Sequence, residues 1–334
     1  MASIRVVHLG LGPIGAAVAR QIAARPGFRI VGAVDVDPAK VGKDLGTIVA
    51  LKKRLGVRVQ DDLAQVLKST KPDVVVHCTS SSLPRVAPEI EAVLRAKVAV
   101  VSTTEELAYP WRTHKKIAAA LDAKAKKAKV GVLATGVNPG FTMDALPIML
   151  TAACERVDRV VVQRVQDARL RRLPFQQKIG TGLTVEQFAR KVQDGSVRHV
   201  GFTQSIAMIG DALGWKLDRI TDEIRPKIAD HTVESEFLAV DRGYVCGIIQ
   251  DGTGYRRGKP VISLHLEAYL GAPESFDQID IEGSPTLSTR CTTGYHGDVV
   301  TASMVVNAIR HVLEAKPGLH TMRSLALPSF CAGR

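Results

Sequence analysis

The sequence has few aromatic residues and lacks the usual motifs of metal and hydrolase sites. Phe, Trp and Tyr make up 4% of its 334 residues, which leaves little material for stacking against nucleobases. Its five cysteines are scattered and form no CxxC pair, as is typical of reduced thiols rather than of a disulfide framework or zinc site. Neither HExxH nor GxSxG occurs. We therefore expect no metal site.

Long apolar runs are also missing. None approaches the roughly 18 residues that a membrane span needs. The N-terminal stretch MASIRVVHLG enters an apolar strand almost at once, without the pattern of a signal peptide. We expect a cytoplasmic protein without membrane contact. Hydrophobic and charged fractions of 46% and 23% are those of an ordinary globular chain, and the length is sufficient for two domains.

The net charge of +12 raises the possibility of an acidic partner. Much of it lies in THKKIAAALDAKAKKAKV, residues 113–130, where lysines alternate with alanines. This pattern is typical of the solvated face of a crossover helix. Together with the shortage of aromatic residues, it argues against a nucleic-acid partner.

The first 35 residues carry the pattern of a dinucleotide-binding loop. An apolar strand leads into LGLGPIGAAVARQIAA, which has the spacing GxGxxG and includes Pro13 and Ile14. A second apolar strand ends on Asp35, 20 residues after the last glycine. Gly10 would form the tight turn, Gly12 would let pyrophosphate approach, and Gly15 would let the helix pack on the strand. The helix N-terminus favours the anion.

Asp35 favours NAD over NADP. Its carboxylate is placed to accept hydrogen bonds from the adenosine ribose, and it would repel a 2′-phosphate. Val36 follows it instead of an arginine that would clamp the phosphate, and Lys40 is the nearest cation. We expect NAD as the cofactor, with use of NADP open.

Strands and helices then alternate up to about residue 140, with continuous apolar strands. This pattern predicts a doubly wound parallel sheet, a Rossmann fold, whose ligands bind at the carboxyl ends of the strands. Polar residues follow three of the strands. They are expected to line one crevice and to contact cofactor or substrate: Thr79, Ser80 and Ser81; Thr103, Thr104, Glu105 and Glu106; and Asn138, Pro139 and Gly140.

After residue 141 the pattern changes to long strands with separate helices, as in an α+β domain with an open mixed sheet. Residues 243–271 predict a hairpin, and DGTGYRRGK within it lacks the spacing of a phosphate loop. We expect a cofactor domain over 1–140, a substrate and dimerisation domain over 141–297, and a C-terminal helix and tail over 298–334 that packs on the first domain. A sheet face shared with a second subunit would make a homodimer.

Five stretches carry a resemblance that runs over about residues 4–329: STTEELAYPW, TGVNPGFTMD, RRLPFQQKIGTGLT, TGYHGDVVTASMVVNAI and AKPGLHTMRSLALP. Together they resemble the 2,4-diaminopentanoate dehydrogenase family, which includes the native amine dehydrogenases and is related in fold to dihydrodipicolinate reductase. The resemblance implies NAD(P)-dependent oxidative deamination of an amine to a ketone and ammonia, and the reverse reductive amination. It also implies a homodimer and a catalytic glutamate within the EE pair.

The Glu105–Glu106 pair suits that chemistry. A carboxylate beside the reacting carbon can take the ammonium proton, stabilise an iminium and activate water, which is typically worth about 10²- to 10⁴-fold. An acid in the first turn of a helix also complements the helix dipole without any catalytic role. We expect one glutamate to be catalytic and the other to complement the helix dipole. Their spacing does not show which residue has which role.

Other candidates for the pocket have structural alternatives. The Asn138 amide would bind nicotinamide or hold the glutamate, unless it only caps a turn. Phe141 and Met143 would shape the pocket or fill the core, and His296 would face the pocket or be structural.

The substrate stays open at this level. A substrate carboxylate would need a cation, for which Arg164, Arg171, Arg172 and Arg290 are candidates, whereas a simple ketone would need an apolar pocket. Besides an amine dehydrogenase, a dihydrodipicolinate reductase-like imine reductase and a non-catalytic NAD-binding sensor fit the cofactor loop.

Overall fold

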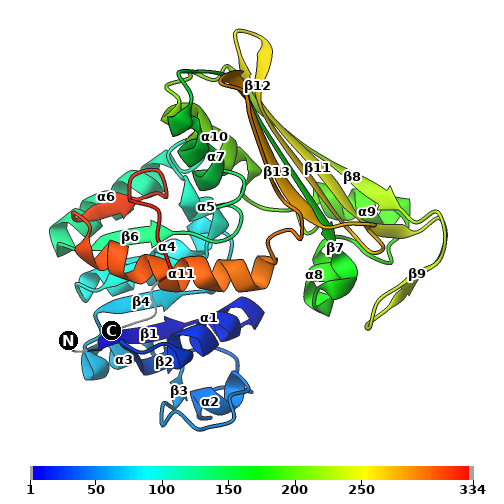
Figure 1. The fold of residues 1–334 in the computed structure, drawn as a ribbon. Helices are drawn as coiled ribbons and strands as arrows, with labels where there is room; N and C mark the ends of the chain where they lie inside the picture. Colours follow the sequence, from blue (N-terminus) through cyan, green and yellow to red (C-terminus); the bar gives the residue numbers. More distant parts are fainter. Residues whose placement is uncertain (1–2, 331–334) are drawn as a thin grey trace. The chain divides into compact units, whose positions relative to one another are not determined.

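The computed structural model of the chain describes residues 3–330. It divides into two compact units, whose elements are labelled in Figure 1. The first unit contains the residues up to Phe141 and those from His296 onward, and the second contains Thr142–Tyr295. Two separate stretches of the chain therefore build the first unit.

A parallel sheet forms the centre of the first unit. Within residues 3–330 it has seven strands in the order β3-β2-β1-β4-β5-β6-β15, and all neighbouring pairs are parallel. This is the predicted doubly wound arrangement, which is confirmed. The strands are β1 (Ile4–Leu9), β2 (Phe28–Val34), β3 (Val59–Gln60), β4 (Val74–His77), β5 (Ala99–Ser102), β6 (Gly131–Ala134) and β15 (Gly318–His320).

Helices cover both faces of this sheet, which is why its central strands are buried and almost continuously apolar. Val7 and Leu9 of β1 join the apolar core that α3, α4 and α6 share. On the other face α11 lies beside α1, and Gln21 Nε2 donates to Ser303 Oγ at 3.1 Å. The helices are α1 (Pro13–Ala24), α2 (Leu45–Ile48), α3 (Leu63–Thr70), α4 (Leu83–Arg95), α5 (Glu105–Ala108), α6 (Lys115–Ala128) and α11 (Gly297–Glu314).

The second unit contains a mixed sheet in the order β14-β13-β7-β12-β11-β8. Only the β7–β12 pair is parallel among the described neighbours in this sheet. The predicted open mixed sheet is therefore confirmed. Its strands are β7 (Arg156–Asp167), β8 (Arg219–Ile228), β11 (Val245–Arg256), β12 (Lys259–Tyr269), β13 (Phe276–Ser284) and β14 (Leu287–Cys291).

One face of this sheet carries the apolar core of the unit, on which α9 and α10 pack through Phe188, Phe202 and Ile206. Gly252 of β11 is required there, because a Cβ atom on it would lie 2.7 Å from Phe202 Cδ1. The helices of the unit are α7 (Ala145–Leu150), α8 (Leu173–Lys178), α9 (Val185–Gln193) and α10 (Phe202–Ala212), with 3-10 turns η1 (Thr151–Ala153) and η2 (Ala168–Leu170).

The predicted hairpin is confirmed, since β11 and β12 are antiparallel and joined by Arg257 and Gly258, both at positive φ. Sequence analysis missed β8, whose charged residues and Pro226 are atypical of strands. It also missed β14, β15 and the short pair β9 (Val233–Glu234) and β10 (Ala239–Val240). Across residues 3–330, no helix combines the length and apolar character that a membrane span requires.

Candidate active site at the strand ends of the first unit

The glycine loop between β1 and α1 has two crowded positions and one open position. Gly10 adopts φ +90°, and a Cβ atom on it would lie 2.6 Å from the carbonyl oxygen of Cys78. A Cβ atom on Gly15 would lie 2.0 Å from the carbonyl oxygen of Gly10. At Gly12 a Cβ atom would meet nothing within 4 Å. Gly10 and Gly15 therefore allow close packing, while the backbone of Gly12 faces open space.

The N-terminus of α1 points its free N–H groups toward this opening. Gly12 is the N-cap residue and makes no side-chain cap, Pro13 occupies the first turn, and no acidic residue is present there. Ile14 follows and is partly buried. Uncapped N–H groups and the helix dipole favour an anion. These residues fit the pyrophosphate of a dinucleotide.

Asp35 directly follows β2 and lies beside the glycine loop. Its Oδ2 accepts a hydrogen bond from Leu11 N at 2.6 Å, and its Oδ1 accepts one from Asp37 N at 2.9 Å. Lys40 Nζ lies 3.3 Å from Asp35 Oδ2 and 3.2 Å from Asp37 Oδ2. Burial opposes the charge of Lys40, but the two carboxylates outweigh it and raise the pKa of Lys40. The aspartate is thus held in place beside a cation.

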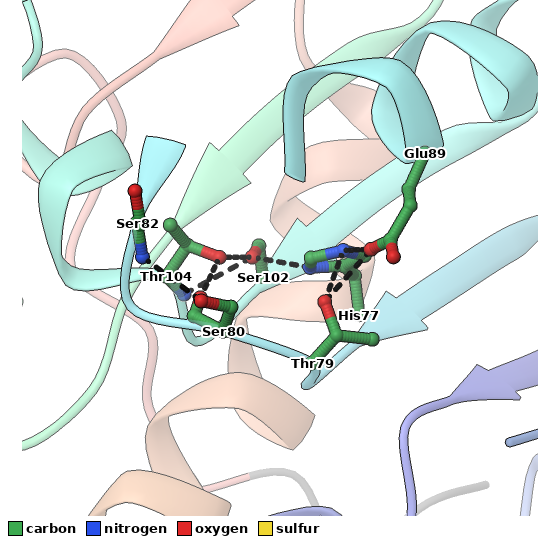
Figure 2. Close-up of polar contacts among 7 residues, drawn as sticks. All are labelled: His77, Thr79, Ser80, Ser82, Glu89, Ser102 and Thr104. Atoms are coloured by element: carbon green, nitrogen blue, oxygen red, sulfur yellow. Dashed lines mark hydrogen bonds and ion pairs between the residues drawn. The ribbon is translucent and has the colours of Figure 1, made fainter. Parts of the chain in front are cut away.

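The loop after β4 is tied to the loop after β5. The Ser81 carbonyl accepts a hydrogen bond from Glu106 N at 3.3 Å, and the Ser80 carbonyl accepts one from Thr104 Oγ1 at 2.8 Å. Thr103 N donates to the carbonyl of His77 at 3.0 Å. The structure therefore brings these two predicted groups of polar residues together at one edge of the sheet, as Figure 2 shows for Ser80 and Thr104.

Side chains behind these loops form a second layer of contacts. Glu89 Oε2 of α4 accepts a hydrogen bond from Thr79 Oγ1 at 2.7 Å. Glu89 Oε2 also lies 2.7 Å from His77 Nε2. Ser80 Oγ accepts a hydrogen bond from Ser82 N at 3.2 Å. Figure 2 shows these residues converging from β4, α4 and the loop that joins them.

The two glutamates of the EE pair have different surroundings. Both lie in the first turn of α5, which follows the N-cap Thr104. Glu106 Oε2 accepts a hydrogen bond from Leu83 N at 2.8 Å and lies 3.2 Å from His114 Nε2. Glu105 is partly exposed, and its carboxylate makes no hydrogen bond or ion pair within residues 3–330.

The loop after β6 contains the third predicted group. Asn138 is 6% exposed and forms a cis peptide bond with Pro139. Gly140 has φ +127°, and a Cβ atom on it would lie 2.4 Å from Gly136 N. Phe141 is partly buried. The structure holds this loop close to the end of β6, in the same unit as the glycine loop.

Two further candidates are placed elsewhere. Met143 is fully buried in the apolar core of the second unit. His296 is exposed and is the N-cap residue of α11 in the first unit.

Four groups that sequence analysis did not select lie around the site, namely the buried His8 and His77 and the partly exposed Glu89 and His114. His8 on β1 is fully buried, with its Nε2 3.2 Å from the position that a Cβ atom on Gly15 would take. Burial lowers the pKa of His8 to about 4 and keeps the ring neutral. Burial likewise raises the pKa of the Cys78 thiol to about 12. The sequence feature that could have identified His8 is its position near the end of an otherwise apolar strand.

The second unit contains a separate cluster of buried charge. On β7, Arg164 Nη1 lies 2.5 Å from Asp277 Oδ1 of β13, and both side chains are 3% exposed. Arg164 Nη2 donates to the Tyr295 carbonyl at 2.6 Å. Burial lowers the pKa of Arg164 and raises the pKa of Asp277. The opposite charge of the partner residue opposes the pKa shift in both cases.

The remaining arginine candidates differ in exposure. Arg171 is 7% exposed and donates to Gln166 Oε1 at 2.9 Å. Arg290 Nη2 lies 2.8 Å from Glu274 Oε2, and Arg290 stacks over the Phe276 ring. His199 lies nearby, and its pKa is lowered to about 3 by burial and then by surrounding cations that include Arg164 and Arg171.

Comparison with known proteins identifies the relatives of both units. Residues 141–334 match the family of the 2,4-diaminopentanoate dehydrogenase C-terminal domain, and residues 4–134 match the dihydrodipicolinate reductase N-terminus. A 2,4-diaminopentanoate dehydrogenase of Acetoanaerobium sticklandii is 33% identical over 100% of this chain and 96% of its own length. The chain belongs to the 2,4-diaminopentanoate dehydrogenase family.

Other relatives agree with this membership. An amine dehydrogenase of Streptomyces virginiae is 25% identical over 97% of this chain and 96% of its own length. The structure of an amine dehydrogenase from Mycobacterium smegmatis superposes with a TM-score of 0.89 at 27% identity, covering 100% and 99% of the two chains. The predicted resemblance is confirmed. The chain is an NAD(P)-dependent oxidoreductase of the amine dehydrogenase type.

A more distant structure shows the fold alone. The dihydrodipicolinate reductase from Paenisporosarcina sp. TG-14 superposes with a TM-score of 0.54 at 16% identity, over 96% and 97% of the two chains. Within residues 3–330, no group of three or more His, Cys, Asp or Glu side chains is arranged to hold a metal ion.

Proposed function

We propose that the chain interconverts a primary amine and its ketone, with Glu105 as the catalytic carboxylate and Glu106 as a structural residue. The observation that carries this assignment is the difference between the two carboxylates. Glu106 is held by Leu83 N and His114, whereas Glu105 lies in the same helical turn with no such contact. A carboxylate that exchanges protons with a substrate cannot be committed to a helix N-terminus.

The residues of the first unit then have distinct tasks. Gly10, Gly12 and Gly15 hold the pyrophosphate at the N-terminus of α1, and Asp35 accepts from the adenosine ribose. Bound nicotinamide accepts or returns the hydride. Thr79, Ser80, Ser81, Thr103 and Asn138 are the candidate contacts on the nicotinamide side, with Pro139, Gly140, Phe141 and His296 around the substrate.

Glu105 manages the protons of the reaction. It takes a proton from the substrate ammonium and passes it to solvent, so that the neutral amine can lose hydride from its α-carbon to the bound nicotinamide and become an iminium. The regained carboxylate stabilises that cation and takes a proton from the water molecule that adds to the iminium carbon. It returns this proton to the nitrogen of the resulting carbinolamine, and it takes the hydroxyl proton as the C–N bond breaks. The ketone remains, and ammonia leaves with that proton as ammonium.

The preferred cofactor is NAD, with NADP tolerated. Asp35 keeps its charge at the ribose position through hydrogen bonds from Leu11 N and Asp37 N. A 2′-phosphate would meet this carboxylate, although Lys40 at 3.3 Å from Asp35 reduces the repulsion.

We favour a substrate amine that carries a carboxylate, such as 2,4-diaminopentanoate. The 33% identity to a 2,4-diaminopentanoate dehydrogenase over the whole length of this chain supports this choice. Amines without a carboxylate are the second candidate, supported by the amine dehydrogenase relatives.

A paired assay separates these candidates. NADH oxidation is measured with 2-amino-4-oxopentanoate and with 2-pentanone, each with and without ammonium. The proposal predicts ammonium-dependent turnover that is faster with the carboxylate-bearing ketone. Faster turnover of 2-pentanone would support the second candidate. Turnover without ammonium would indicate a different reductase, and no turnover at all with tight NADH binding would indicate a sensor.

We further propose a homodimer built on the second sheet. The face opposite its apolar core carries partly exposed polar side chains on adjacent strands, where His265 Nδ1 lies 2.6 Å from Asp251 Oδ1 and Lys227 Nζ lies 3.1 Å from Glu267 Oε2. Light scattering should give twice the chain mass of 35.9 kDa. A monomer at all concentrations would contradict this proposal. The four described cysteines are free, which supports a reducing cytoplasmic location.

A further inference from the structure

A chain of hydrogen bonds connects α4 to the two loops that carry the candidate site residues (Figure 2). At its centre is His77 of β4, which is fully buried. Its Nε2 lies 2.7 Å from Glu89 Oε2 of α4, and its Nδ1 lies 2.9 Å from Ser102 Oγ of β5. Both ring nitrogens are therefore engaged in short contacts.

The hydrogen bonds of the Thr104 and Ser102 hydroxyl groups determine whether His77 Nδ1 donates or accepts. Thr104 Oγ1 donates its proton to the Ser80 carbonyl at 2.8 Å, and Ser102 Oγ donates its proton to Thr104 Oγ1 at 3.0 Å. A hydroxyl has one proton to give. The short contact between Ser102 and His77 therefore needs the proton on Nδ1.

The opposite side of the ring also needs a proton. Glu89 Oε2 already accepts from Thr79 Oγ1 at 2.7 Å, and an unprotonated Nε2 at 2.7 Å from a carboxylate oxygen would be repelled. Burial opposes the ionisation of Glu89, but hydrogen bonds from His77 and Thr79 outweigh it and lower the pKa of Glu89. A ring with both protons, facing an ionised Glu89, satisfies every contact in the chain.

We propose that His77 and Glu89 are a positioning pair for the reaction. The Glu89 carboxylate holds the second proton on His77, which fixes the ring as a donor to Ser102. The chain through Ser102 and Thr104 then holds the Ser80 carbonyl and the N-cap of α5 in register. Neither residue contacts the reacting atoms. This inference rests on the proposed placement of nicotinamide and Glu105 at these loops.

Two substitutions at His77 separate positioning from simple packing. The amide nitrogen of Asn occupies the place of Nδ1 and can donate to Ser102 without help from Glu89, whereas that of Gln occupies the place of Nε2. His77→Gln should lower kcat by about tenfold or more, as expected for a displaced catalytic group, while NADH affinity and KM change little. His77→Asn should retain most of kcat.

Glu89 supplies a second test with a matched control on the same helix. Glu91 of α4 also pairs with a cation, its Oε1 lying 2.6 Å from Lys124 Nζ of α6. Glu89→Gln should lower kcat several-fold, while Glu91→Gln should not. In the His77→Asn background, Glu89→Gln should have no further effect, because the amide donor needs no partner carboxylate. The Glu89 side chain is 40% exposed, so this variant is expected to fold.

Each outcome of these experiments tests one proposal. Equal losses for His77→Asn and His77→Gln, or equal kcat for Glu89→Gln and Glu91→Gln, would overturn the positioning pair. If Glu105→Gln keeps wild-type turnover in the same assay, the assignment of Glu105 as the catalytic carboxylate is wrong instead, and if the wild type itself shows no ammonium-dependent turnover, the proposed function is wrong. A Glu105 variant without turnover, together with silent Glu89 variants, would leave the function intact and remove only this inference.

Discussion

The two units place their polar residues at different points of their sheets. In the first unit the candidate residues follow buried parallel strands, as Ser80 follows β4 and Glu105 follows β5. In the second unit they lie inside a strand, where Arg164 and Gln166 of β7 continue the buried face of Val160 and Val162. Polar groups at strand ends can contact ligands, whereas buried polar groups within a strand must form hydrogen bonds or ion pairs with neighbouring residues.

This difference has an energetic consequence. At the strand ends of the first unit, hydroxyls satisfy backbone carbonyls without charge, as between Thr104 and Ser80, and the proposed His77–Glu89 pair keeps its carboxylate 40% exposed. Inside the second sheet, Arg164 and Asp277 lose their hydration and need each other. Substitutions at the strand ends of the first unit should therefore change activity more than stability, except at Glu106, which is committed to contacts with Leu83 N and His114. Substitutions in the second unit should change stability more than activity.

The largest expected effect is at Glu105. Glu105→Gln removes the proposed proton acceptor and should lower ammonium-dependent turnover by about 10²- to 10⁴-fold. NADH binding, followed by fluorescence titration, should stay unchanged, as should the melting temperature. Turnover close to wild type would show that the EE pair is only a helix start.

Substitutions in the second unit should change the stability of the protein. Asp277→Asn leaves the Arg164 cation buried without its anion and should lower the free energy of unfolding by about 3–5 kcal/mol. Arg159 and Glu282 join the same two strands at 3.2 Å, but their side chains are 37% and 55% exposed. Glu282→Gln should therefore cost only about 0–1 kcal/mol. Urea denaturation measures both, and equal losses would contradict the comparison.

A smaller effect is expected at the adenosine end of the first unit. Asp35→Ser removes a like charge from the 2′-phosphate position and should shift the ratio of kcat/KM toward NADP(H) by about tenfold or more. Asp37→Ser is the control, because Asp37 shares Lys40 but not the contact with Leu11. A wild type that already prefers NADP(H) would refute this placement of Asp35.

The smallest effect is expected at Glu106. Glu106→Gln weakens a charged contact with the N-terminus of α4 and with His114, which should cost about 0.3–1 kcal/mol of stability. Turnover should remain near wild type. Thermal unfolding and steady-state rates measure the two quantities, and a loss of turnover like that of Glu105→Gln would reverse the assignment of roles.

Much of the first unit was predictable because its signals are local. The glycine loop, the apolar strands and the polar residues after them are each read from a few neighbouring residues. The second unit was harder, because β8 carries charges and Pro226, and because Arg164 looks like an exposed position in an alternating strand. Its burial depends on Asp277, which lies 113 residues away.

The sequence by itself determined the alternation of strands and helices over the first 140 residues, the dinucleotide loop and the family, since these depend on residue types at short spacing. Only the tertiary structure distinguished Glu105 from Glu106, because the groups that hold Glu106 come from α4 and from the turn before α6. It also joined His77 to Glu89 and Ser102 across three elements. Adjacent residues of one type have the same local pattern, and only their partners from distant parts of the chain give them different surroundings.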